Sequence, residues 1–150
     1  MEHKTEKAKL EEGRDLLLDF DKLKKVAASG VPVVPVAVQD ADTMAVLLIG
    51  YANETALDHT LRHGVAAFWS TSRNELWIKG ATSGDTLEIV DVRVNCEQNA
   101  LLYLVRLKGH GSCHTKGSDG KTRLSCYYRS IKSGRLEFFG AEETGSETHS

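Results

Sequence analysis

Long apolar runs are missing from this sequence, and so is an excess of charge of one sign. The longest apolar stretches, 44–49 and 100–105, are far shorter than the roughly 20 residues that a membrane-spanning helix needs. The N-terminus is charged and holds no apolar signal core, so we expect a cytoplasmic protein that does not associate with membranes. The 19 basic and 21 acidic side chains give a net charge of −2, which argues against nucleic-acid binding.

Cysteine is scarce and occurs only at Cys96, Cys113 and Cys126. Three thiols cannot all pair as disulfides within one molecule, and reduced thiols without an export signal also indicate the cytoplasm. Three soft ligands with a fourth position open to water are typical of catalytic zinc, whereas structural zinc usually has four protein ligands. The alternative is three unrelated buried thiols, because free cysteine packs like a small apolar side chain. Spacing alone does not decide, since the chain has no CxxC pair.

The chain is long enough for one domain with its own core, and we predict an α+β fold with two or three helices. Residues 1–13 are polar and expected to be frayed, whereas apolar residues spaced three or four apart predict an amphipathic helix over 14–28. Asn53 as N-cap and Gly64 as C′ residue predict a second helix over 54–63. Its inward-facing residues would be Ala56, Leu57 and Leu61.

Mostly antiparallel strands are predicted at 36–39, 44–51, 65–70, 76–80, 87–95 and 100–107. The first two form a hairpin, and Pro32 and Pro35 should keep 31–34 out of a central ladder. The stretch 100–105 is apolar on both faces, which indicates either a central strand or one covered by a partner subunit. Tight turns are expected at 72–75 and 97–99, a loop at 108–123, a short last strand at 125–128 and a disordered tail beyond residue 140.

Both tryptophans lie in the segment 68–85, together with Arg73, Lys79 and several hydroxyl groups. This segment could bind a phosphorylated aromatic ligand, with the cations and the backbone near Ser83 on phosphate and an indole stacked on a base. The alternative, which chemistry alone favours, is an ordinary hairpin with a pair of tryptophans in the core. His59 and His63 lie one helical turn apart, but no HExxH glutamate separates them, so we interpret them as surface histidines near a helix C-terminus.

The longest motif is residues 68–84, read Phe-Trp-Ser-Thr-Ser-Arg-Asn-Glu-Leu-Trp-Ile-Lys-Gly-Ala-Thr-Ser-Gly. With Cys113-His114-Thr115 and Ser125-Cys126-Tyr127-Tyr128-Arg129, it resembles the phosphoribosyl-AMP cyclohydrolase family over about residues 33–129. The resemblance implies a single domain over 1–150, with this core, a polar N-terminal extension and a C-terminal tail. It also implies a zinc-dependent hydrolase of histidine biosynthesis that opens the N1–C6 bond of the adenine ring of phosphoribosyl-AMP.

The resemblance further implies an intertwined homodimer with zinc sites shared between subunits. Cys96 would come from one subunit, and Cys113 and Cys126 from the other. His114, beside a zinc ligand, is the candidate general acid or base, although it could instead orient Cys113, and His110 is a weaker candidate. The residues that would bind the phosphorylated purine nucleotide are Trp69, Ser70, Ser72, Arg73, Trp77, Lys79, Thr82, Ser83 and Gly84.

Two features depart from the family pattern. The first cysteine of the family usually lies in Asp-Cys-Asp-x-Asp, whose carboxylates bind magnesium, but this chain has Asn95, Glu97 and Asn99 at those positions. With one carboxylate in place of three, we expect magnesium to bind weakly or not at all. In addition, twelve residues separate Cys113 from Cys126, which is longer than usual for the family.

Because of the altered turn, a second hypothesis is that the chain is a paralogue that uses the same zinc chemistry on another purine-like heterocycle. A non-catalytic zinc-binding dimeric module is a third possibility, against which the complete set of three cysteines and His114 argues.

Overall fold

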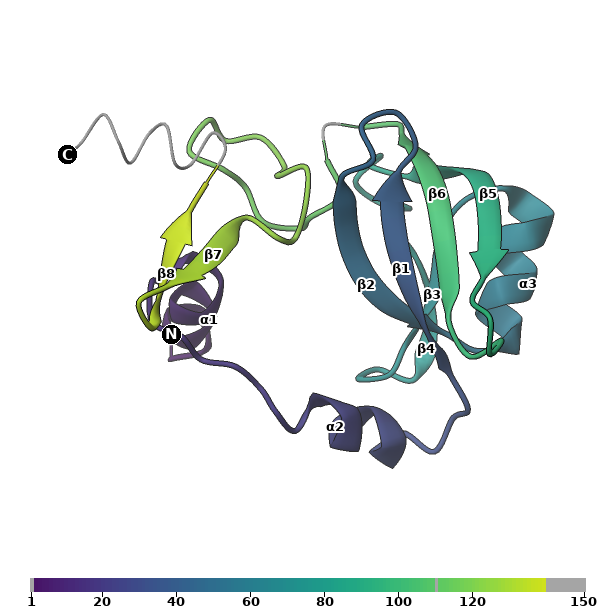
Figure 1. Ribbon diagram of the computed structural model, residues 1–150, viewed down its shortest axis with the longest axis horizontal. Coiled ribbons are helices and arrows are strands. Elements are labelled where there is room, and N and C mark those ends of the chain that lie inside the picture. Colours follow the sequence, from purple (N-terminus) through teal and green to yellow (C-terminus); the bar gives the residue numbers. More distant parts are fainter. Residues whose placement is uncertain (1, 110, 140–150) are drawn as a thin grey trace.

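The computed structural model describes residues 2–109 and 111–139, which form an α+β fold of the predicted class (Figure 1). The described residues form three helices: α1 (Glu2–Glu12), α2 (Lys22–Ala28) and α3 (Glu54–His63). They form eight strands: β1 (Val34–Asp40), β2 (Val46–Ala52), β3 (Ala67–Ser70), β4 (Glu75–Ile78), β5 (Leu87–Val94), β6 (Leu101–Leu107), β7 (Arg129–Lys132) and β8 (Arg135–Phe138). Every strand pairing is antiparallel except that of β1 with β6. No helix within the described ranges is long and apolar enough to cross a membrane.

The largest sheet has the strand order β2-β1-β6-β5. β1 and β2 form the predicted hairpin, and β1 also pairs in parallel with β6, with Val36 opposite Leu101. β6 therefore lies inside the sheet, which accounts for the apolar residues on both of its faces. β3–β4 and β7–β8 are separate two-stranded hairpins.

The N-terminal end of β1 differs from the prediction, because the strand begins at Val34 and includes Pro35. Pro35 lies opposite Tyr51 of β2, and the pairing with β6 begins only at Val36. A residue without an N–H group is tolerated at this end because the strand there has a partner on one side only.

The hydrophobic core joins the large sheet to α3 and the β3–β4 hairpin. Its most deeply buried side chains are each at most 1% exposed: Val36, Val38, Leu47, Phe68, Leu87, Tyr103 and Val105. Burial of a side chain of this size contributes roughly 1.5–3 kcal/mol to stability. The core therefore holds α3 and the β3–β4 hairpin firmly against the sheet.

α3 begins and ends at the predicted residues. The side chain of Asn53 accepts a hydrogen bond from the N–H of Ala56 at 2.9 Å, and Gly64 has the left-handed conformation (φ 69°) that ends the helix. Leu61, however, is 61% exposed instead of facing the core. Thr60 takes the buried position and exchanges hydrogen bonds with the backbone of Ala67 at 2.9 and 3.3 Å.

The N-terminal prediction was wrong in two respects. Residues 2–12 form α1, and helix α2 occupies only 22–28 of the predicted 14–28. α1 has no apolar face, so hydrophobic spacing could not reveal it. Its C-terminal carbonyl groups instead accept hydrogen bonds from residues that lie more than a hundred positions later in the chain, Tyr128 and Arg129. The apolar residues of 16–23 remain largely exposed, with Phe20 at 90%.

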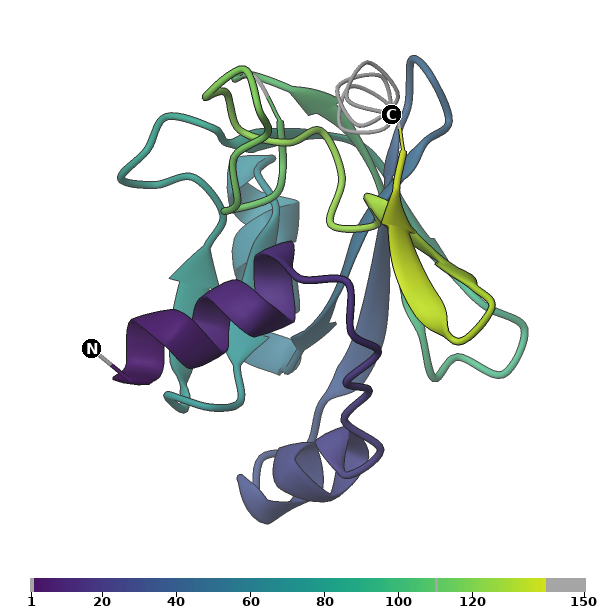
Figure 2. The ribbon, with the colours of Figure 1, turned by 90° about the vertical axis from the view of Figure 1, so that its left-hand side faces the viewer.

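The C-terminal strand prediction was also wrong. Residues 125–128 form no strand, because the Ser125 hydroxyl accepts a hydrogen bond from the N–H of Tyr127 and makes a local turn. The β7–β8 hairpin follows instead, and Arg129 at its start contacts the C-terminal end of α1. Figure 2 shows the hairpin next to the segment that follows α1. The predicted tail beyond residue 140 and His110 lie outside the described residues.

Candidate functional site

Cys113 is positioned by a loop whose two arms pair with each other. The N–H of Cys113 donates to the carbonyl oxygen of Arg123 at 3.1 Å, and the N–H of Arg123 donates to that of Thr115 at 3.0 Å. Gly111 permits this approach, because a Cβ atom there would lie 2.2 Å from the Arg123 carbonyl oxygen. The long segment between the last two cysteines is thus a folded-back loop that returns the chain toward Cys113.

Cys126 is held at the start of β2. Its N–H donates to the carbonyl oxygen of Leu47 at 2.8 Å, and the neighbouring Ser125 hydroxyl donates to that of Val46 at 2.7 Å. Cys126 is exposed, whereas Cys113 is buried. The large sheet therefore provides a fixed support for one thiol and the folded-back loop for the other.

The two thiols influence each other directly. A hydrogen bond with Cys126, together with contacts to Thr115, lowers the pKa of the Cys113 thiol to about 5. The same interaction with Cys113 raises the pKa of Cys126. The Thr115 hydroxyl lies 2.9 Å from the Cys113 sulfur, and the N–H of Thr115 donates to the same sulfur at 3.5 Å. Such donors favour a thiolate, which is the form of cysteine that binds metal ions.

A pocket of about 610 Å³ lies between the β4 region and this loop. It brings together five of the predicted nucleotide-binding residues with Cys113 and His114. Those five are Arg73, Trp77, Lys79, Thr82 and Ser83. Its volume lies within the range typical of small-molecule sites, and its wall combines an aromatic ring with several cations.

Lys79 is the buried cation of this pocket. Its side chain is 7% exposed, and its ammonium group lies 5.9 Å from the centre of the Trp77 ring. Lys79 and Cys113 line the same pocket. An anionic ligand would compensate a buried positive charge of this kind. The pocket thus joins an anion-binding group to the thiols.

The other predicted nucleotide-binding residues have structural contacts outside the pocket lining. Trp69 packs against the core and donates to the Asn74 side chain at 3.0 Å. The Ser70 hydroxyl accepts from the N–H of Arg73 at 3.3 Å and lies 3.4 Å from that of Ser72. Gly84 has a left-handed φ of 84° and closes the turn that carries Thr82 and Ser83. Each of the two interpretations therefore holds for one tryptophan: Trp69 packs against the core, and Trp77 lines the pocket.

The turn between β5 and β6 carries the positions expected to hold magnesium. The Asn95 side-chain oxygen accepts from the N–H groups of Asn99 (2.9 Å) and Ala100 (3.0 Å), and its amide donates to the Asn99 side-chain oxygen at 2.7 Å. Both amide oxygens are therefore engaged within the turn, which leaves Glu97 as its only carboxylate. This donor set does not fit a cation that prefers carboxylate oxygens and water.

Cys96 lies on the same turn and is exposed. In Figure 1 this turn lies at the lower end of the large sheet, whereas β2 starts, beside Cys126, at the upper end. Among the described residues of one chain, no three His, Cys, Asp or Glu side chains come together as a metal site. One copy of the chain thus brings two of the three cysteines together and leaves the third apart.

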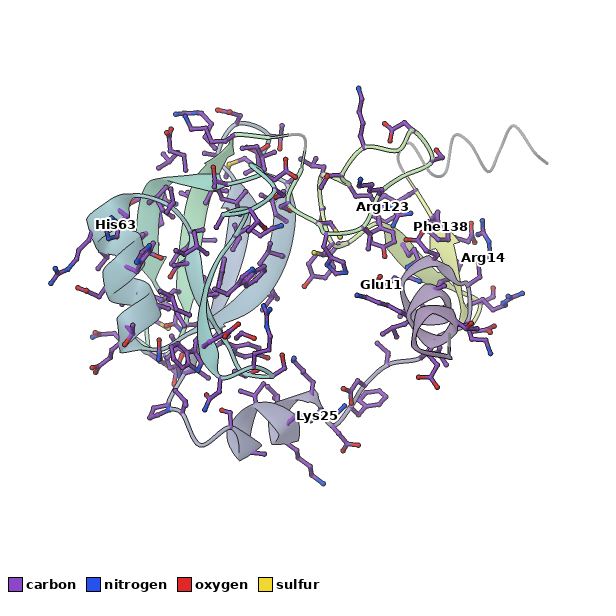
Figure 3. All side chains as sticks on the ribbon, turned by 180° about the vertical axis from the view of Figure 1, so that it is seen from behind. Glu11, Arg14, Lys25, His63, Arg123 and Phe138 are labelled. Atoms are coloured by element: carbon purple, nitrogen blue, oxygen red, sulfur yellow. The ribbon has the colours of Figure 1, made fainter. Side chains whose placement is uncertain are left out.

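Sequence reasoning missed one residue that lines the pocket, Lys116, and one that contacts a lining residue, Glu11. Lys116, on the folded-back loop, lines the pocket opposite the β4 region. Glu11 of α1 places its carboxylate 2.5 Å from Nε2 of His114. The extra length of the loop between Cys113 and Cys126 indicated a changed pocket rim. Nothing in the sequence, however, pairs residue 11 with residue 114. His59 and His63 lie on α3 with ring centres 4.2 Å apart (His63 is labelled in Figure 3), and neither lines the pocket.

Comparison with known proteins assigns this arrangement to a class. Residues 48–128, which include all three cysteines and the pocket, match the phosphoribosyl-AMP cyclohydrolase family. The chain belongs to the phosphoribosyl-AMP cyclohydrolase family, a family of enzymes that the sequence motifs also indicated.

Individual relatives agree with the family. A phosphoribosyl-AMP cyclohydrolase from Hyphomonas neptunium is 47% identical over 102 residues, 68% of this chain and 72% of that protein. One from Sphingopyxis alaskensis is 40% identical over 137 residues, 91% of this chain and 100% of that protein. The histidine biosynthesis bifunctional protein HisIE of Aquifex aeolicus is 36% identical over 105 residues, 70% of this chain and 48% of that protein.

Proposed function

We propose that this chain hydrolyses phosphoribosyl-AMP, opening the N1–C6 bond of its adenine ring in histidine biosynthesis. The observation that carries the proposal is the pocket in which the Trp77 ring and the cations Arg73, Lys79 and Lys116 lie beside Cys113 and His114. The substrate has one aromatic base and two phosphate groups. An aromatic ring with several cations therefore matches its chemistry.

Within this pocket, Trp77 stacks on the base and the cations bind the phosphates. His114 exchanges a proton with the attacking water or with the leaving ring nitrogen. Thr82 and Ser83 supply hydroxyl donors at the rim. These roles explain why the predicted binding residues of the β4 region share one pocket with residues of the Cys113 loop.

Zinc is the metal that the donor set supports. Cys113 and Cys126 share a hydrogen bond that lowers the pKa of Cys113, so the pair fits two positions of a zinc site, and Cys96 of a second copy would supply the third. When bound, zinc supplies Lewis-acid activation of water. His114 is next to Cys113 in sequence, so the proton-exchanging group and the metal ligands share one loop.

A homodimer with shared sites is part of the proposal. Two observations support it: Cys96 lies at the other end of the sheet from Cys126, and apolar side chains of 16–23 are exposed. The exposed side chains are Leu17 (52%), Leu18 (59%), Phe20 (90%) and Leu23 (70%). Such a cluster is typical of a surface that a partner covers.

The altered turn between β5 and β6 favours a second candidate substrate. Because Asn95 and Asn99 engage each other, a substrate that depends on magnesium at this turn would bind less well. A related purine-like heterocycle opened by the same chemistry is therefore the alternative to phosphoribosyl-AMP.

The test is turnover of phosphoribosyl-AMP by the purified chain, with complementation of growth without histidine in a cell lacking its own cyclohydrolase. We expect ring opening and growth with the parent chain and with Glu6→Gln, a change on the exposed side of α1. Cys113→Ser should abolish both. A parent chain that binds zinc and folds but neither turns over the substrate nor restores growth would favour the second substrate.

A further inference from the structure

The N-terminal helix reaches the candidate catalytic residue. Oε2 of Glu11 lies 2.5 Å from Nε2 of His114, which is a short hydrogen bond. The Glu11 side chain is only 24% exposed. The carboxylate therefore contacts a residue of the proposed site, although α1 is outside the residues that match the family.

Glu11 is held in place by contacts on both sides. Glu12 makes two hydrogen bonds with the guanidinium group of Arg123, at 2.8 and 3.0 Å. The Tyr128 hydroxyl donates to the carbonyl oxygen of Glu11 itself, and Arg129 donates to those of Leu10 and Gly13. Figure 3 shows α1, with Glu11 labelled, below the loop that carries Arg123. A helix end fixed in this way holds its side chains in one orientation.

We propose that Glu11 is a positioning residue that orients the His114 ring and selects its tautomer. A carboxylate accepts a hydrogen bond, so the neutral ring carries its proton on Nε2 and leaves Nδ1 as the acceptor for the reaction. The C-terminal end of α1 then supports the catalytic machinery through Glu11. This inference rests on the proposed function, because it assigns His114 a proton-exchanging role.

The first test compares variants on one helix. Glu11→Ala should lower kcat on phosphoribosyl-AMP by about tenfold or more, a part of the 10²–10⁴ that a positioned acid or base contributes, while KM changes by less than about twofold. Glu11→Gln keeps a carbonyl acceptor and should retain more activity than Glu11→Ala. Glu6→Gln, which removes a carboxylate from the exposed part of α1, should match the parent chain. A Glu11→Ala protein as active as Glu6→Gln would overturn the proposal.

A second measurement does not depend on turnover. The ¹⁵N resonances of the His114 ring, assigned by their loss in His114→Ala, should show one tautomer protonated at Nε2 in the parent chain. Glu11→Ala should give a mixture of tautomers, and Glu6→Gln should not. Unchanged His114 resonances in Glu11→Ala would refute positioning. If the parent fails to turn over phosphoribosyl-AMP while the tautomer responds to Glu11, the substrate assignment fails and the positioning contact stands.

A double variant separates positioning from general damage. If Glu11 acts through His114, the Glu11→Ala/His114→Ala protein should be no slower than His114→Ala alone, because the two changes remove one function. Losses that multiply would mean that Glu11 acts independently of His114, and would contradict the proposal.

Discussion

The turn residues between β5 and β6 illustrate how single substitutions can alter a metal site without altering the fold. An aspartate at position 95 could accept the same two backbone hydrogen bonds that Asn95 accepts, from Asn99 and Ala100. The asparagines thus preserve the turn geometry. What they remove is negative charge, and each charge beside a cation at 4 Å contributes ~4 kcal/mol at an effective dielectric constant of 20.

Restoring that charge is the first prediction. Asn95→Asp, Glu97→Asp and Asn99→Asp together should tighten magnesium binding at least tenfold, since ~1.4 kcal/mol suffices for that change, and should raise activity on phosphoribosyl-AMP. Titration calorimetry with magnesium, on the triple variant and the parent, measures the change. Tight, ordinary magnesium dependence in the unaltered chain would show that the asparagine turn is no impediment.

Lys116 gives a second prediction at the same scale. If it binds a phosphate group, Lys116→Ala should raise KM for phosphoribosyl-AMP by roughly tenfold, the value of one charge-assisted hydrogen bond, and leave kcat nearly unchanged. Lys121→Ala is the matched control, because Lys121 is exposed on the same loop but does not line the pocket. Equal KM values for the two variants would remove Lys116 from the binding site.

Among the elements, the turn after β4 forms one wall of the pocket and depends on Gly80. This residue has a left-handed φ of 79°, and a Cβ atom on it would lie 2.2 Å from the backbone of Asp85. Gly84 also has a left-handed φ, of 84°, but a Cβ atom there would meet nothing within 4 Å. Both glycines avoid backbone strain, but only Gly80 permits a close approach.

The two glycines therefore make a matched pair. Gly84→Ala should cost only the left-handed strain, ~1–2 kcal/mol of unfolding free energy. Gly80→Ala should cost a further ~1–3 kcal/mol for the clash and should raise KM by displacing Thr82 and Ser83. Urea denaturation and steady-state kinetics measure both quantities. Equal stability losses would mean that the turn adapts to a side chain at position 80.

The elements that the sequence predicted are those with a local signal. Asn53 and Gly64 mark the ends of α3 within its own sequence, and apolar stretches mark β1, β2 and β6. α1 lacks such a local signal. Its position depends on contacts with Arg123, Tyr128 and Arg129, which lie more than a hundred residues later in the chain. For the same reason the motifs identified Cys113 and His114, whereas Glu11 could be recognised only in three dimensions.

At the scale of the whole molecule, the third cysteine gives the strongest prediction. If Cys96 completes a site on another copy, Cys96→Ser and Cys113→Ser proteins should each be inactive alone. After subunit exchange, half of the molecules would be heterodimers with one intact site, so activity should return to about a quarter of the parental value. Zinc content should rise in parallel. No recovery after demonstrated exchange would mean that each chain binds its metal alone.

The contacts between α1 and the C-terminal segment also set an order of events during synthesis. They join residues more than a hundred positions apart in sequence, such as Leu10 with Arg129. The large sheet can close once β6 has left the ribosome, whereas α1, made before the sheet, waits for residues that are made after it. Contacts of such long sequence separation form late because the chain between them must close first. A chain interrupted after β6 would keep its sheet and have an undocked α1, so a helix synthesised before the sheet reaches its place after it.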